Sequence, residues 1–145
     1  MATSPDPIFA TGFGNLVARP TTAKTTMTDS TNAVRFQQTG ANWEAGAEGA
    51  LITRMKARCL GTGSIGATVC YLFTSPDDGT TLCLKAAKLF SAQTVSTTVP
   101  SAEVDFEATF DDPIALAPGE WLYAAISVTN ATGFQFEGSF EDFAV

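Results

Sequence analysis

The fold class follows from eight consecutive residues, Glu103-Val104-Asp105-Phe106-Glu107-Ala108-Thr109-Phe110. Apolar and polar side chains alternate through this stretch with a period of two. That period places the apolar set on one face of a pleated strand and the polar set on the opposite face. The pattern predicts a half-buried antiparallel strand whose inner face carries Val104, Phe106, Ala108 and Phe110 and whose outer face is a row of acidic side chains.

Related runs recur along the chain and are separated by turn signals rich in Gly, Pro, Asn and Asp. Short strands with this punctuation predict an all-β chain, specifically an antiparallel β-sandwich of jelly-roll type. Residues 82–92 also fit a helical stripe, but the run is short and its flanks are hairpin-like, so we assign it as a strand. The expected strands are residues 33–38, 50–60, 67–75, 81–90, 103–110, 121–128 and 134–140.

The first 32 residues differ in composition from the rest. We expect them to form an extended N-terminal arm and linker, with the β-sandwich domain at residues 33–145. Residues 13–19 have the pattern of one strand, which pairs either with a neighbouring subunit or with the edge of its own sandwich. A Thr-rich stretch, residues 20–32, is expected to be a flexible linker that contributes little to the core. The apolar patch of the arm consists of Ile8, Phe9, Phe13, Leu16 and Val17.

The formal net charge of −7 is unevenly distributed, because all eight basic residues lie in the first 88 positions. The rest of the chain carries nine acidic residues and no basic one. Binding of nucleic acid requires Lys or Arg to replace phosphate counterions, so this part of the chain is not a nucleic-acid surface. It is either a solvated acidic face that favours solubility or a surface oriented away from something negative, such as packaged DNA.

Three basic residues, Arg54, Lys56 and Arg58, alternate with Met55 and Ala57 and therefore share one face of a strand. This cationic stripe has two interpretations. It either pairs across the sheet with acidic residues or contacts an acidic surface of another subunit. The expected cross-strand partners are Glu103, Asp105 and Glu107.

Several catalytic chemistries are missing from the sequence. There is no histidine, no phosphate-binding loop and no dinucleotide fingerprint, so we expect no enzymatic activity, no cofactor and no metal site. Adjacent acids at positions 77–78 and 111–112 are interpreted as turn formers rather than as a catalytic pair. A calcium site at residues 77–79 is the weaker alternative, because the EF-hand spacing is absent.

Cysteines and aromatic residues complete the inventory. Cys59, Cys70 and Cys83 lie in apolar runs without metal-ligand spacing, and we expect buried thiols in a reducing compartment. No secretory signal or membrane-spanning run is evident, so the sequon at Asn130 is interpreted as a hairpin turn. Trp121 and Tyr123 fall on one strand face and are expected to pack inside, whereas Trp43 is the candidate for an exposed aromatic in a glycan-binding module.

The order of signals after residue 50 resembles a known family. ITRMKA at residues 52–57 is followed by ATVCYLF at residues 67–73 with an Asp-Gly hairpin, then by a Leu-Lys strand and the acidic alternating strand. LAPGEWLYAA at residues 116–125 follows, with a closing Gly-Phe hairpin. Over about two-thirds of the chain, this pattern is similar to the head-decoration (cement) proteins of tailed bacteriophages, which are β-sandwich subunits that coat a mature capsid.

The resemblance implies a non-enzymatic virion protein that stabilises the head by binding across capsomer junctions. Its partners would be the major capsid protein and further copies of itself, with a trimer favoured, and neither nucleic acid nor membrane. It would reside on the capsid surface after assembly in the bacterial cytoplasm. The candidate interface residues are Ile8, Phe9, Phe13, Leu16, Val17, Arg54, Lys56 and Arg58. The alternative is a phage tail or fibre module that binds a receptor or glycan through Trp43 and neighbouring loops.

Overall fold

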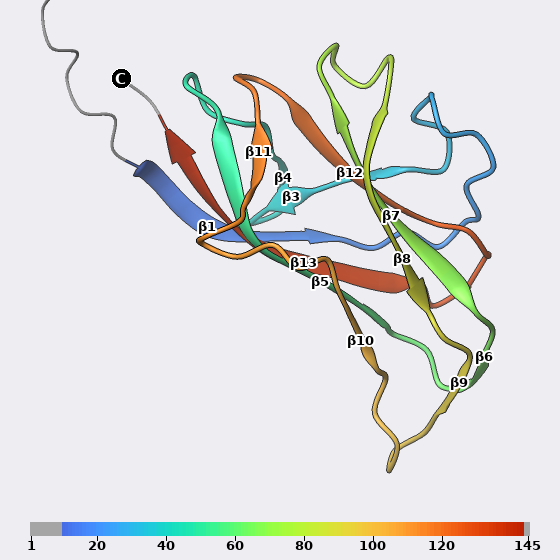
Figure 1. Cartoon of the computed structure of the whole chain (residues 1–145). Helices are drawn as coiled ribbons and strands as arrows, with labels where there is room; N and C mark the ends of the chain where they lie inside the picture. The colour runs from blue at the N-terminus through green and yellow to red at the C-terminus, as the bar shows by residue number, and fades with distance from the viewer. Residues whose placement is uncertain (1–9, 144–145) are drawn as a thin grey trace, which may run out of the picture.

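The computed structural model describes residues 10–143, which consist of β-strands and loops with no helix among them (Figure 1). The all-β prediction is therefore confirmed, and two main antiparallel sheets form a β-sandwich-like arrangement. Within residues 10–143, no helix is long and apolar enough to cross a membrane. The strands are β1 (Ala10–Ala18), β2 (Val34–Arg35), β3 (Gln37–Gln38), β4 (Ala41–Asn42), β5 (Ala50–Cys59), β6 (Gly63–Ile65), β7 (Thr68–Ser75), β8 (Cys83–Phe90), β9 (Gln93–Val95), β10 (Glu103–Asp105), β11 (Ile114–Leu116), β12 (Trp121–Ile126) and β13 (Phe134–Phe143).

The larger sheet has the order β10-β5-β13-β1-β3-β4, and β11 pairs with β5 beyond the end of β10. Its long central strands are β5, β13 and β1, which lie side by side in Figure 1. In β5, Met55, Ala57 and Cys59 are buried, while the basic residues between them reach the surface. This is the period of two that the sequence predicts for a strand with one solvated face.

The smaller sheet has the order β2-β12-β7-β8, with β12 and β7 in its centre. Both faces of these two strands are largely buried, which explains their near-continuous apolar runs. A third sheet is a two-stranded ribbon of β6 and β9. The pairing of β8 with β7 confirms that residues 83–90 form a strand and not a helix.

The core lies between the two main sheets and is rich in aromatic side chains. Phe136 from β13 is its centre: the ring stacks on Phe106 at 5.8 Å between centroids and meets Phe36 edge-on at 6.3 Å. Phe90 and Phe134 form a further edge-to-face pair at 5.1 Å. Such offset and edge-on pairs add roughly 0.5–1.5 kcal/mol each to the area that the rings bury.

The N-terminal region is integrated into this body. β1 pairs with β13 from Ala10 to Ala18 and also meets β3, so this segment folds back on its own sandwich, the second of the two alternatives from the sequence. Leu16 of β1 is fully buried in the core. The strand is an inner one of the sheet, because β3 and β4 lie beyond it.

Residues 20–32 differ from the expected flexible linker. They cover the outer face of the smaller sheet, where Phe73, Leu82, Tyr123 and Ala125 form a second buried cluster. Met27 packs against this cluster, and the amide of Lys24 donates to the carbonyl of Ile126 at 2.8 Å. The many threonines of this stretch led to the prediction of a solvated linker, and most of them do face solvent. A few other side chains fill the space beneath the loop, and the threonine-rich composition does not reveal this contribution to packing.

The cysteine prediction is correct for two residues and wrong for the third. Cys59 and Cys70 are buried, whereas Cys83 is exposed. Cys83 begins β8, an edge strand, and a bulge opposite Leu72 and Phe73 breaks the alternation of that strand. The apolar run in β8 therefore does not indicate that its side chains are buried, and Leu84 and Leu89 of the same strand are exposed as well.

Candidate interaction surface

The outer face of the larger sheet gathers most of the residues that the sequence nominated for an interface. Val17 of β1 lies opposite Glu137 of β13, and Glu137 lies opposite Lys56 of β5. The candidate residues Phe13, Val17, Arg54, Lys56 and Arg58 all belong to this face. Leu16 does not, because it points into the core, and Ile8 and Phe9 lie outside the described residues.

The cationic stripe on β5 is neutralised by neighbouring acids. Arg58 bonds Glu103 at 2.7 Å, Lys56 lies 3.6 Å from the same carboxylate, and Arg54 reaches Glu137 at 3.3 Å. The cross-strand prediction is confirmed for Glu103, whereas the partnership with Glu137 was not predicted. The sequence does contain a sign of this partnership, because Glu137 occupies an outward-facing position in the alternating run of β13. The cationic stripe therefore forms a network of ion pairs and is not an uncompensated positive surface.

The other two predicted acidic partners have different roles. The carboxylate of Asp105 accepts the amide of Glu107 at 2.8 Å, which is a local turn contact. Glu107 itself pairs with Lys88 of β8 at 3.2 Å and so links the two main sheets at their margin. Because these ion pairs are exposed to solvent, each contributes only about 0–1 kcal/mol to the stability of the fold.

One end of the outer face carries two exposed aromatic side chains. Phe13 is 66% exposed and Phe110 is 77% exposed. On the same face, the Ser139 hydroxyl donates to the Asn15 side-chain oxygen at 3.3 Å, and Ser139 lines a hollow of about 320 Å³ together with Phe110. We call Phe13, Asn15, Phe110 and Ser139 the neutral patch. Charged residues border it: Glu141 lies opposite Phe13, Arg54 lines the hollow, and the exposed Asp111 and Asp112 directly follow Phe110.

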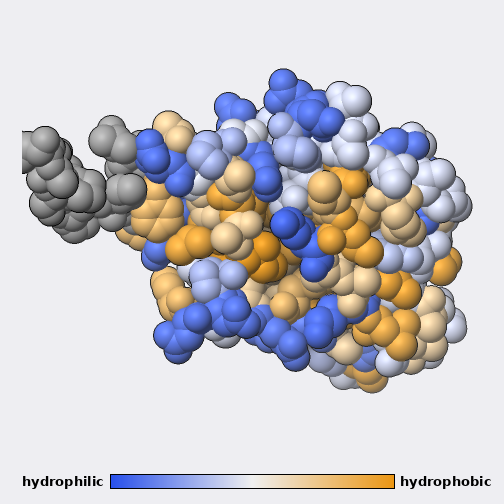
Figure 2. All heavy atoms as spheres, turned by 45° about the horizontal axis from the view of Figure 1, so that its top comes forward, coloured by the Kyte–Doolittle hydropathy of each residue, from blue (hydrophilic) through white to orange (hydrophobic). Residues whose placement is uncertain are grey.

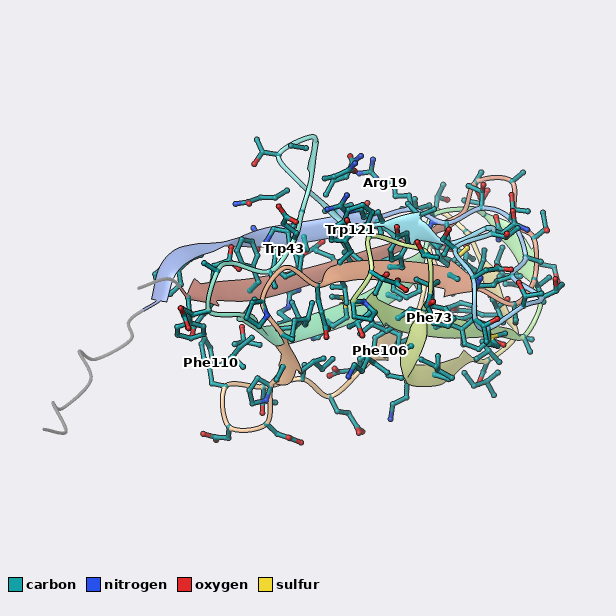
Figure 3. The ribbon with its side chains drawn as sticks, turned by 90° about the horizontal axis from the view of Figure 1, so that it is seen from above. Arg19, Trp43, Phe73, Phe106, Phe110 and Trp121 are labelled. Carbon is teal, nitrogen blue, oxygen red and sulfur yellow. The ribbon has the colours of Figure 1, made fainter. Side chains whose placement is uncertain are left out.

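The views of the whole molecule agree with this placement. Figure 3 shows Phe110 near the end of the molecule where β1 begins, whereas Phe106 lies further along and closer to the smaller sheet. In Figure 2 hydrophobic residues reach the surface in patches separated by hydrophilic ones, including at the end where β1 begins.

The exposure of Phe110 corrects the opening prediction. Val104, Phe106 and Ala108 are buried as expected, but the strand ends at Asp105 and Phe110 faces solvent. After Phe106 donates its amide to Met55, Glu107 adopts a positive φ of 63° and the chain leaves the sheet. A positive φ at a non-glycine residue interrupts the period of two, so the apolar pattern beyond it does not determine a face.

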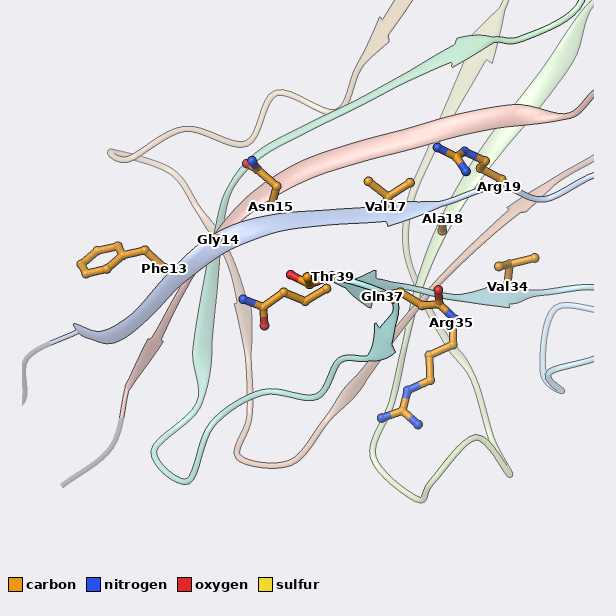
Figure 4. A pocket seen from close by; sticks show the side chains of 12 residues that line it. Phe13, Gly14, Asn15, Val17, Ala18, Arg19, Val34, Arg35, Gln37 and Thr39 are labelled. Carbon is orange, nitrogen blue, oxygen red and sulfur yellow. The ribbon is translucent and has the colours of Figure 1, made fainter.

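A groove of about 740 Å³ runs beside β1. One wall is formed by β1 residues from Phe13 to Ala18, except the buried Leu16, together with the following Arg19, and the other wall is formed by β2, β3 and the turn after β3 (Figure 4). At one end of the groove, the Nε of Arg19 donates a hydrogen bond to the side-chain oxygen of Gln135 at 3.0 Å. Arg35 stacks on Trp121 with 3.4 Å between the guanidinium carbon and the ring centroid.

The aromatic platform proposed for glycan binding is not formed. Trp43 is only 4% exposed, and its ring packs at 5.0 Å from that of Phe140, so its expected exposure is wrong. It lies beside Asp142, whose pKa is raised by burial and partly lowered again by the hydrogen bond from the Gly46 amide. Tyr123 is buried as predicted.

The turn interpretations of the polar motifs are confirmed. Asp77 accepts the amide of Thr81 at 2.7 Å and the hydroxyl of Ser75 at 3.1 Å, and these bonds lower its pKa, the amide most of all. Asn130 accepts the amides of Thr132 and Gly133, each at 3.1 Å. Within residues 10–143, no three side chains of His, Cys, Asp or Glu come together in a way that could hold a metal ion.

Comparison with known proteins adds no further constraint. No protein-family model matches the chain, and neither a curated protein nor a solved structure matches it. The functional argument therefore depends on the surface itself.

Proposed function

We propose that this protein is a non-enzymatic decoration (cement) protein of a phage capsid, which binds across capsomer junctions and stabilises the mature head. The observation that supports it is the neutral patch bordered by ion pairs on the outer face of the larger sheet. Protein interfaces have this anatomy, with aromatic side chains in a core depleted of charge and a polar rim around it.

Each bound subunit would bury apolar surface against the capsid shell, and the binding free energy of the bound subunits would add to the stability of the shell. Complete burial of one phenylalanine side chain contributes about 1.5–3 kcal/mol, before the entropy lost on docking is subtracted. Binding to the expanded shell and not to other states would shift stability toward that shell by mass action. The ion pairs at the border would set orientation more than affinity.

The finer architectural and assembly expectations belong to the same proposal. The nested pairing of β5 with β13 and of β7 with β12 favours the jelly-roll type, although the β7–β8 hairpin lies within one sheet. The partners would be the major capsid protein and further copies of this chain, with a trimer favoured, at the capsid surface. The carboxyl-terminal excess of acids suits a face turned away from packaged DNA.

The first experiment is a count of copies. Intact particles produced by the genome that encodes this chain are purified and analysed by quantitative mass spectrometry. A decoration protein is expected in numbers comparable to the capsomers. Absence from the particle, or presence in only a few copies, would contradict the proposal and favour the tail or fibre alternative.

A second experiment tests the neutral patch. Phe110→Ser is compared with Val128→Ser, an exposed apolar residue in the β12–β13 connection. Co-sedimentation with particles stripped of this protein should weaken about 10- to 100-fold for Phe110→Ser, the loss expected for one buried aromatic, and stay unchanged for the control. Equal binding by both variants would remove the neutral patch from the interface.

The alternative of receptor or glycan binding is tested on a glycan array with the unaltered protein. Because Trp43 is buried, the platform proposed for this alternative is not available. Specific glycan binding that Trp43→Phe leaves intact would therefore indicate a different site and contradict the decoration role.

A further inference from the structure

The ribbon of β6 and β9 and the loops beside it contain no charged residue. They consist of residues 60–67 and 91–102, and we call these two segments the uncharged end. β6 and β9 lie at the lower right of Figure 1, away from the start of β1. Charged residues make up 16% of the chain, so two neighbouring segments without any deplete this surface of charge.

Strand pairing and side-chain hydrogen bonds hold the two segments together. β6 pairs with β9 from Gly63 to Ile65. The side chain of Gln93 donates to the carbonyl of Pro100 at 3.0 Å and accepts the amide of Ala102 at 2.8 Å. These bonds fold the loop after β9 back onto that strand. The uncharged end is therefore one continuous surface built from two parts of the chain.

Two large apolar side chains of the uncharged end face solvent. Leu60 is 42% exposed and Val99 is 44% exposed. Ile65 and Val95 are buried, so the inside of the ribbon is filled by other residues. Most of the remaining residues are Ser, Thr, Gly and Ala. Exposed apolar side chains on a surface without charge match the charge-depleted centre of a protein interface.

An ion pair borders this surface. Arg58 lies two positions before the first segment and Glu103 directly follows the second. Their side chains are 2.7 Å apart, so the two charges compensate each other. The uncharged end is thus surrounded, on the side of β5 and β10, by the polar rim that protein interfaces have.

We propose that the uncharged end is a contact between copies of this chain around a rotation axis. The net charge of −7 makes two copies repel each other. Near a rotation axis the same residues of each copy lie next to one another, so a charged residue there would meet its own equivalent. Like charges placed together oppose association. A surface without charge avoids this cost, so it is the surface on which copies can meet.

A second copy suits this surface better than a charged partner of another kind. A basic protein would be attracted to the acidic part of the chain, which carries nine acids and no base after position 88. An acidic protein can approach closely only where those charges are absent. Another copy of this chain is such an acidic protein.

This inference rests on the proposed function in one respect, because a decoration protein that acts as an oligomer needs a contact between its copies. The uncharged end lies apart from the neutral patch, since Phe110 is near the end of the molecule where β1 begins. Association in solution, without a shell, tests the uncharged end, whereas the capsid experiments test the neutral patch. Failure of either set of experiments therefore leaves the other interpretable.

The test is a concentration series of the full chain at low and high salt, with the mass measured by light scattering. We expect a small closed oligomer. Its dissociation constant should stay unchanged or fall as salt rises, because salt screens the repulsion between acidic copies and no ion pair lies at the centre of the contact. A chain that stays monomeric at every concentration would overturn the proposal. So would an association that high salt weakens by more than about tenfold.

Two exposed leucines provide a matched pair of variants. Leu60→Asp should weaken association about 10- to 100-fold, the loss expected when one leucine side chain is no longer buried. Leu84 on β8 is 49% exposed and lies outside the uncharged end, so Leu84→Asp should associate like the unaltered protein. The melting temperatures of both variants show whether each is folded. Weakening by Leu84→Asp equal to that by Leu60→Asp would contradict the proposed location.

Charges of both signs at Val99 distinguish a second copy from another partner. Val99→Asp and Val99→Lys should both weaken association, because each copy brings the same charge to the axis. The Ser96 amide donates to the carbonyl of Val99 at 2.9 Å, and both substitutions keep this backbone bond. Stronger association with either sign would mean that an oppositely charged surface faces the uncharged end, and would overturn the proposal.

Two further outcomes would also overturn it. One is normal association of the Leu60 and Val99 variants alike. The other is a Leu60→Asp variant that keeps the mass of the oligomer but no longer co-sediments with the capsid, because the shell and not a second copy would then cover the uncharged end.

Discussion

The ammonium group of Lys24 lies 5.4 Å from the centroid of the Phe73 ring, on the outer face of the smaller sheet. It donates to the carbonyls of Asp29 at 2.6 Å and Thr31 at 2.8 Å, and the Asp29 carboxylate is 3.6 Å away. Burial lowers the pKa of Lys24, and the attraction of Asp29 opposes that shift. This side chain therefore fastens the loop of residues 20–32 over the second apolar cluster.

Loss of this contact should destabilise the fold from the loop inward. Lys24→Ala leaves two carbonyls beneath the loop without their charged donor, and we expect a loss of about 2–4 kcal/mol in the free energy of unfolding. Urea denaturation measures the loss, and hydrogen exchange should show the loop opening first. The control is Lys85→Ala on exposed β8, expected within about 0.5 kcal/mol of the unaltered protein. Equal stability of the two variants would contradict this account.

Two phenylalanines four positions apart should respond oppositely to truncation. Phe106 is 6% exposed and stacks on Phe136, so Phe106→Ala should lose about 3–5 kcal/mol through the cavity that it leaves. Phe110 is mostly exposed, and Phe110→Ala should change stability by no more than about 0.5 kcal/mol. Thermal and urea unfolding of both variants provide the comparison. A similar loss at both positions would mean that Phe110 is a core residue after all.

Removal of the acid shared by two cations should have a small effect that depends on salt. Glu103 contacts both Lys56 and Arg58, whose side chains are about one-third to one-half exposed. Glu103→Gln should lower stability by less than about 1 kcal/mol at low ionic strength, and by a negligible amount near 1 M salt. Glu48→Gln, at another exposed acid, is the control. A loss that persists in high salt would show that the pair is not a screened surface interaction.

The three thiols should react at very different rates. Cys83 is exposed and should be labelled in the native protein by a maleimide, whereas Cys59 and Cys70 should be labelled only after unfolding. Burial, assisted by the nearby Cys59, raises the pKa of Cys70 to about 12, so its thiolate is scarce at neutral pH. Peptide mapping by mass spectrometry distinguishes the sites. Native labelling of Cys70 at the rate of Cys83 would be incompatible with its buried position.

Acid should remove the stabilisation that comes from the turn at Asp77. The Thr81 amide lowers the pKa of Asp77 in the folded state below its ordinary value of 3.8. Its stabilisation is therefore complete above that value and is lost as the pH falls through the folded pKa. Asp77→Asn should flatten the dependence of the melting temperature on pH below about pH 5. Asp78→Asn serves as the control, because the Thr81 amide bonds Asp77 instead. An unchanged slope in the Asp77 variant would disprove the assignment.

The sequence alone was sufficient for the identity of the long strands and of the turns between them. The alternation of Arg54, Lys56 and Arg58 with apolar residues predicted both faces of β5. These features are local. A period of two assigns a strand face wherever the backbone stays extended, and Asp, Asn and Gly residues form turns through bonds to nearby amides.

The tertiary structure decided what depends on distant partners. Phe110 faces solvent because Glu107 leaves the extended region, and Trp43 is buried because β13 brings Phe140 against it. The tertiary arrangement also determined that residues 20–32 would cover one sheet and that β1 would be an inner strand between β13 and β3. A side chain is buried only when another element covers its face, and a strand is an edge only when no other strand pairs with it. Both conditions are set by pairings between residues that are far apart in the chain, so no local pattern contains them.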